Sequence, residues 1–156
     1  MSRGLGDVYK RQGCLETEDS FANMTDKQFS TFMQASVLAG MAISYTGTSI
    51  PHGLSYTLTY ENGVPHGKAV GVFLSGFLKN YGDSSLAGYI VKELLGFEDI
   101  DAFRDYIRRL FGKLEISDKL WQKDRDGILA NPAKLKNYPF GLTAEVLDDY
   151  VGYYNG

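Results

Sequence analysis

Apolar residues recur every three to four positions along most of the chain, which is the spacing of amphipathic helices. Thr25 and Gln28 form a capping box, and the apolar residues after them predict a long helix over about residues 26–44. Pro51 fits the first turn of a second, short helix. Proline lacks an amide hydrogen, and an amide in the first turn has no acceptor within the helix. Residues 61–63, Glu-Asn-Gly, then indicate a turn.

Five further helices follow in the pattern, and no stretch shows a convincing strand alternation. They are expected from Pro65 to about 81, from Asp83 to 96, over 100–111, over 117–128, and from Thr143 onward, with loops at 131–132 and 138–141. The helix over 65–81 is apolar nearly all round, so we expect it in the middle of the domain. Residues 53–60 have a β-prone composition and are the one segment where a strand is the alternative. The chain therefore predicts an all-α fold, a bundle of about seven helices.

The composition of the chain excludes several classes of protein. The chain has 156 residues with 16 basic and 19 acidic side chains, a net charge of -3, which suits one domain and argues against a nucleic-acid partner. The longest nearly unbroken apolar run, residues 69–78, is too short to cross a bilayer, so we expect no membrane partner. A single cysteine, Cys14, excludes a disulfide framework and fits a reducing compartment, for which we expect a cytoplasmic location.

The first twelve residues, MSRGLGDVYKRQ, differ from the rest of the chain. They are basic, and they show neither a period of two nor one of 3.6. They resemble the translated adapter or assembly junctions found at the front of environmental gene fragments; a native disordered leader is the alternative. On the junction interpretation, residues 13–156 are the native part of a truncated protein.

The chemistry of the chain centres on its two histidines, which both lie in Pro-His-Gly tripeptides, at residues 51–53 and 65–67. On one continuous helix they would be about 21 Å apart, but the turn at 61–63 lets the second helix begin near the first. Each imidazole then lies in the first turn of its own helix, where the positive end of the helix dipole favours the neutral, metal-binding form. Gly53 and Gly67 leave room for a group close to the backbone.

Two interpretations of His52 and His66 stay open on the residues alone. A histidine near a helix start is most often a capping or satisfied polar residue. Two in identical tripeptides across a turn favour metal ligation more strongly than either does alone. Since a catalytic metal site takes three or more protein ligands, carboxylates or residues from elsewhere would have to complete it.

Residues 39–82 resemble the signature region of the iron-containing (group III) alcohol dehydrogenases. That family has a Gly-rich stretch, a histidine, about a dozen residues, then Pro-His-Gly and an apolar helix, with the 14-residue histidine spacing found here. Asn137-Tyr138-Pro139 and residues 142–145 resemble its segment before the last helix. The resemblance covers about residues 14–156 and implies the C-terminal helical domain of a dehydroquinate-synthase-like fold.

The resemblance implies a metal site and two further site residues. In the family, an Asp and a His from one helix and then two further histidines hold one divalent metal, Fe(II) or sometimes Zn(II). His52 and His66 match the last two ligands. Tyr56 stands where many members have a second histidine linked to proton movement, and it either donates a hydrogen bond to the substrate or packs. Ile43 matches an apolar position near the nicotinamide, with a plain core role as the alternative.

The expected function is the oxidation of primary alcohols, or the reduction of aldehydes, with NAD(H) or NADP(H). The chain lacks an Asp-x-x-x-His pair before Ala22 and a strand with a Gly-rich turn, as a truncated chain would, so alone it should be inactive and the full-length protein is expected to be a homo-oligomer. Two alternatives remain: polyol oxidation as in glycerol dehydrogenases, and a stand-alone helical binding domain that has lost catalysis.

Overall fold

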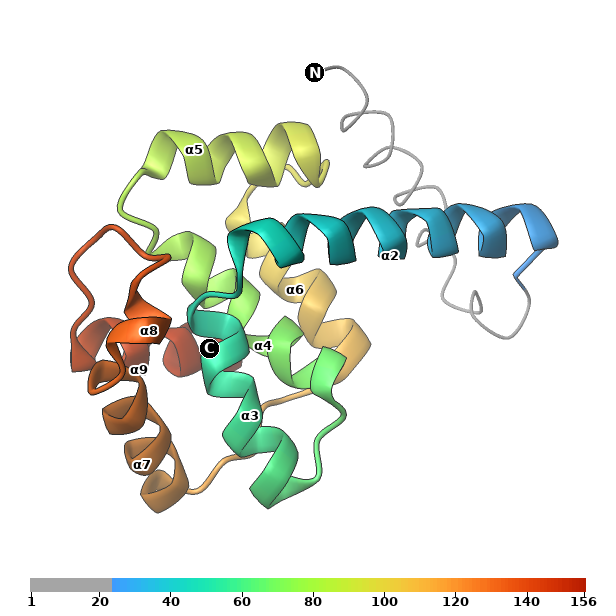
Figure 1. The fold of residues 1–156 in the computed structure, drawn as a ribbon. Coiled ribbons are helices and arrows are strands. Elements are labelled where there is room, and N and C mark those ends of the chain that lie inside the picture. Colours follow the sequence, from blue (N-terminus) through green and yellow to red (C-terminus); the bar gives the residue numbers. More distant parts are fainter. Residues whose placement is uncertain (1–23) are drawn as a thin grey trace.

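The computed structural model describes residues 24–156, and all regular secondary structure in this range is helical (Figure 1). A π-helical segment, Ile90–Leu94, extends α5 without a break. The α-helices are α2 (Asp26–Thr46), α3 (Ile50–Asn62), α4 (His66–Lys79), α5 (Ser84–Tyr89), α6 (Ile100–Phe111), α7 (Asp118–Leu129), α8 (Pro132–Leu135) and α9 (Ala144–Asn155). The all-α prediction is confirmed for the described residues, whereas the expectation for residues 1–12 lies outside them.

The predicted helix starts are confirmed where a side chain caps the first turn. The Thr25 hydroxyl accepts from the Gln28 amide at 3.3 Å while the Gln28 side chain accepts from the Thr25 amide at 2.9 Å, so the capping box forms as expected. The β-prone residues 53–60 lie within α3. The loop expected at 131–132 was wrong: Asn131 accepts the amides of Ala133 and Lys134, and the four-residue helix α8 follows. A helix of four residues is too short to show a period.

Helix α4 lies at the centre of the bundle, packed against α3, α5, α6 and α9. Two of its glycines permit this close packing. A Cβ at Gly71 would lie 2.4 Å from the Phe111 ring of α6, and one at Gly76 would lie 2.5 Å from the Tyr150 backbone of α9. Val72 and Phe73 of the same helix are almost completely buried. The predicted central position of the apolar helix is confirmed.

Helix α2 extends alongside the rest of the bundle with most of its surface open (Figure 1). Ala35 is its one buried residue. Large apolar side chains are exposed along its length: Phe29, Met33, Val37, Leu38, Met41, Ile43 and Tyr45. Despite this apolar surface, no helix within residues 24–156 has the length and hydropathy of a membrane span.

A buried hydrogen bond joins α3 to α7. The Thr57 hydroxyl donates to Asp124 Oδ1 at 2.7 Å, and Asp124 is only 6% exposed. Its second carboxyl oxygen has no hydrogen-bond partner among the described residues. Burial raises the pKa of Asp124 to about 6, against the opposing effect of the Thr57 hydrogen bond and with a further increase from the Glu61 charge. The hydrogen bond therefore fixes α3 against α7. Keeping the buried Asp124 carboxylate ionised, however, lowers the stability of the folded chain.

We expect Asp124→Asn to remove a pH dependence of stability. With a pKa near 3.8 unfolded and about 6 folded, the folded chain binds more protons between these values, so wild type loses stability as the pH rises from 4 to 7. The free energy of unfolding of the variant, minus that of wild type, should grow over this interval by up to about 3 kcal/mol. Urea titrations at several pH values measure it. Asp126→Asn, exposed on the same helix, is the control; parallel curves for Asp124→Asn and wild type would contradict the account.

The two identical tripeptides should respond oppositely to alanine. A Cβ at Gly53 would lie 2.4 Å from Ile128 Cδ1 of α7, whereas one at Gly67 meets nothing within 4 Å. Gly53→Ala should therefore destabilise the chain by about 1–3 kcal/mol through overpacking. Gly67→Ala should be neutral or stabilising by up to about 1 kcal/mol, because alanine is the better helix former. Thermal unfolding of both variants checks this, and equal losses at both positions would contradict it.

Candidate metal centre

The loop of residues 63–65 brings the two histidines together. His52 is the third residue of α3 and His66 the first of α4, so each lies in the first turn of its helix as expected. Gly63 adopts the left-handed conformation (φ 65°), and the Val64 amide donates to the Leu58 carbonyl at 3.2 Å. The loop thus runs back along α3, and the two imidazole centroids lie 5.6 Å apart, with their planes at 63°.

This separation fits a metal held between the rings. A metal bonded to one nitrogen of each imidazole at 2.0–2.1 Å lies about 3.2 Å from each ring centre, and tetrahedral coordination then separates the two centres by about 5.2 Å. The observed 5.6 Å is within a small side-chain movement of that value. Two histidines in this arrangement suit Fe(II) or Zn(II), for which imidazole is a good ligand.

Ser55 determines which nitrogen of His66 is free. Its hydroxyl donates to the His52 carbonyl oxygen at 2.8 Å and lies 3.3 Å from His66 Nδ1. Since the hydroxyl hydrogen is used on His52, Ser55 is left to accept from an Nδ1–H of His66. That tautomer places the lone pair of His66 on Nε2, and a hydrogen bond to the other ring nitrogen is the usual support of a metal-bound histidine. Ser55 is fully buried, three residues after His52 on α3.

Tyr56 and Lys134 complete the cluster around the histidines. The Tyr56 ring stacks on His66, with centroids 5.8 Å apart and planes at 12°. Lys134 Nζ lies 4.7 Å from the centre of the Tyr56 ring. The family resemblance singled out Tyr56, but sequence reasoning missed Lys134. No signal in the sequence links a lysine of α8 to helices α3 and α4.

The surroundings of His52 favour its neutral form. Its pKa is lowered chiefly by partial burial, and then by the charges of His66 and Lys134. The neutral form was expected from the helix dipole, but in the structure desolvation is the largest cause. A neutral imidazole is the form that ligates a metal, so His52 is poised to bind without first losing a proton.

The two imidazoles are the only donors that converge here within residues 24–156. No group of three or more His, Cys, Asp or Glu side chains that could hold a metal occurs in the described range. Since a catalytic metal site takes three protein ligands, the pair alone does not make a complete metal site. His66 is exposed and His52 half-buried, so the open side of the pair is accessible to further ligands.

Ile43 lies on α2, a different helix from those that carry the two histidines, and is 43% exposed. Its expected place beside a nicotinamide therefore stays a prediction.

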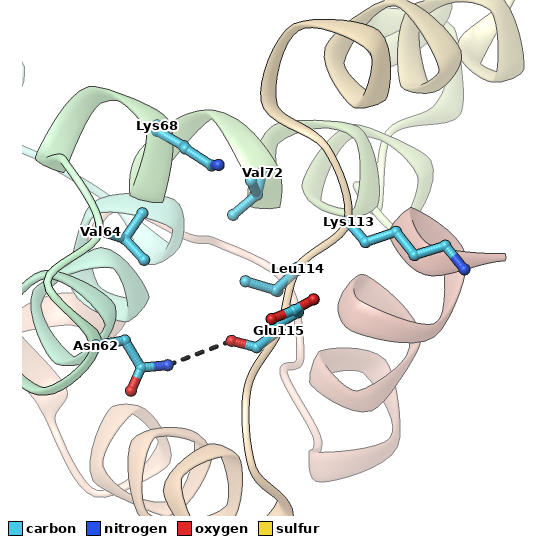
Figure 2. A pocket seen from close by; sticks show the side chains of 7 residues that line it. All are labelled: Asn62, Val64, Lys68, Val72, Lys113, Leu114 and Glu115. Atoms are coloured by element: carbon cyan, nitrogen blue, oxygen red, sulfur yellow. Dashed lines mark hydrogen bonds between the residues drawn. The ribbon is translucent and has the colours of Figure 1, made fainter.

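A separate pocket of about 540 Å³ lies where the end of α3, the start of α4 and the segment after α6 meet (Figure 2). In Figure 2 the Asn62 side chain points toward the Glu115 backbone, and Asn62 Nδ2 donates to the Glu115 carbonyl oxygen at 3.3 Å. Neither histidine lines it. The remaining lining residues are Val64, Lys68, Val72, Lys113 and Leu114. With two lysines and one glutamate but no imidazole, it is not a metal site.

Comparison with known proteins gives one match. The sequence model described as "Fe-containing alcohol dehydrogenase family, C-terminal" matches residues 16–126, which include α2 to α6, most of α7 and both histidines. No curated protein and no solved structure matches the chain significantly.

The electrostatic role of Lys134 can be measured directly. Lys134→Met removes the cation, so we expect the pKa of His52 to rise while staying below its ordinary value, because burial is the larger cause. The chain has only two histidines, so their Cε1 proton signals in an NMR titration are readily assigned with a His66→Ala variant. Lys136→Met, an exposed lysine two residues on, should leave the His52 titration unchanged. An unchanged His52 pKa in Lys134→Met would contradict the placement of this cation.

Proposed function

We propose a function for this chain, which belongs to the Fe-containing alcohol dehydrogenase family. In this proposal it is the metal-binding part of an enzyme that oxidises primary alcohols or reduces aldehydes with NAD(H) or NADP(H). The observation that carries the proposal is the pair of imidazoles from two identical tripeptides, 5.6 Å apart, in a chain that the family match covers from residue 16 to 126.

His52 and His66 would hold the metal, Fe(II) or Zn(II), through one nitrogen each. When bound, such a metal supplies Lewis-acid catalysis, lowering the pKa of an alcohol oxygen so that hydride can leave the carbon. Ser55 contributes by fixing the tautomer of His66 with Nε2 free. We propose that the remaining metal ligands and most of the nicotinamide site come from outside residues 24–156.

Tyr56 is the residue that we propose for contact with the substrate. Its ring is positioned by the stack on His66 and by the Lys134 cation, and it is 42% exposed, so an incoming alcohol can reach it. A phenol hydroxyl both donates and accepts hydrogen bonds. Tyr56 would use these bonds to orient the alcohol oxygen and to pass its proton toward solvent.

Zinc binding tests the proposed ligand pair. Calorimetric titration of the whole chain with Zn(II) at pH 7.5 should show one weak site, weak because two ligands are fewer than a catalytic site uses. His52→Ala and His66→Ala should each lower the affinity by at least about tenfold, the smaller loss expected even for an outer-shell partner. Tyr60→Ala, exposed on the same helix as His52, should bind as wild type does.

The two histidine variants must act alike for the proposal to stand. If either binds Zn(II) as tightly as wild type while circular dichroism shows an intact helical fold, the ion does not lie between the two rings. That result would favour a helical binding domain without a metal centre.

A further inference from the structure

The cluster around the histidines contains a cation that metal binding does not need. Lys134 Nζ lies 4.7 Å from the Tyr56 ring centre and contributes to lowering the pKa of His52. A lysine beside a pair of metal ligands opposes a divalent cation by charge repulsion, so the binding of the metal does not account for its position.

Lys134 is held in this position by packing. A Cβ built on Gly53 would lie 3.6 Å and 3.7 Å from Lys134 Cδ and Cγ, so the aliphatic part of the lysine lies against the first Pro-His-Gly tripeptide. The α8 backbone is fixed by Asn131, whose side chain accepts the amide of Lys134 itself. The ammonium group is therefore carried by a half-buried side chain whose aliphatic stem packs next to the site.

The charge of Lys134 is not neutralised within the described part of the chain. No carboxylate of residues 24–156 forms an ion pair with it, whereas Lys79, Lys123, Arg104 and Arg125 all have acidic partners. An ammonium group has three hydrogen-bond donors, and a cation–π contact uses none of them on an oxygen. The site thus combines one positive charge without an acidic partner among the described residues, its free hydrogen-bond donors, and two imidazoles 5.6 Å apart.

We propose that Lys134 is a specificity residue that binds the carboxylate of an anionic substrate, an aldehyde or alcohol that also carries a carboxylate. The identity of this anion as substrate rests on the proposed function, because it is that function which places the reacting oxygen at the histidine pair. An anionic oxygen group also occurs in the pyrophosphate of a nicotinamide cofactor. The substrate is favoured because Lys134 Nζ lies 4.7 Å from the centre of the Tyr56 ring and Tyr56 stacks on His66, so the cation lies beside the residue proposed to contact the substrate.

The test uses NMR of the whole chain without metal or activity, with the Cε1–H signals of His52 and His66 as probes. Succinate is the carboxylate probe, and 1,4-butanediol, with the same carbon chain and no charge, is its neutral match. Inorganic pyrophosphate represents the cofactor. We expect succinate to shift the histidine signals saturably, with little effect from 1,4-butanediol or from NaCl at matched ionic strength, and weaker binding of pyrophosphate.

Lys134→Met keeps the aliphatic stem and removes the charge. It should weaken succinate binding by at least about tenfold, the effect of one charge-assisted hydrogen bond. Lys134→Arg should restore most of the binding, and Lys136→Met should bind as wild type does. Equal succinate shifts in wild type and Lys134→Met, equal shifts with NaCl, or tighter binding of pyrophosphate than of succinate would each overturn the proposal. Because no metal is present, failure here is distinguishable from failure of zinc binding in the histidine variants.

Discussion

The candidate site depends on one local constraint, the return of residues 63–65 along α3. Had α3 continued as one helix, its two Pro-His-Gly tripeptides would face different parts of the surface about 21 Å apart. The left-handed Gly63 ends the helix, and the Val64 amide bonds back to Leu58, so the chain reverses within three residues. His66 is thereby placed against Ser55 and Tyr56 in the middle of α3. The centroid of its ring lies 5.6 Å from that of the His52 ring.

The rest of the bundle keeps α3 and α4 where that loop places them. Helix α4 is enclosed by four neighbours, and at Gly71 and Gly76 it is approached so closely that a single added carbon would collide with α6 or α9. Helix α3 is fixed from its other side by Ile128 against Gly53 and by the buried Thr57–Asp124 bond to α7. Because these contacts hold the two helices in place, a metal bound by the two imidazoles, as we propose, would bind at a lower entropic cost.

The sequence predicted the helices and the histidine pair well because both are local features. Capping residues and apolar spacing mark helix starts, and a turn between two tripeptides implies their approach. It did not predict α8 or Lys134, since a four-residue helix has no period and the contact of Lys134 with Tyr56, 78 residues earlier, leaves no local pattern. Gly53 and Gly67, in identical tripeptides, looked alike in the sequence, yet one lies against Ile128 and the other faces open space. That difference arises from tertiary packing alone.

X-ray absorption at the zinc edge tests the central claim most directly, because it counts the histidines bound to one ion. The whole chain, loaded with one equivalent of Zn(II), should show the multiple-scattering pattern of two imidazoles at about 2.0–2.1 Å, with water oxygens completing the shell. The His66→Ala chain should lose the paired pattern. A spectrum with one imidazole or none in the wild-type chain would contradict the claim that His52 and His66 form part of one metal centre.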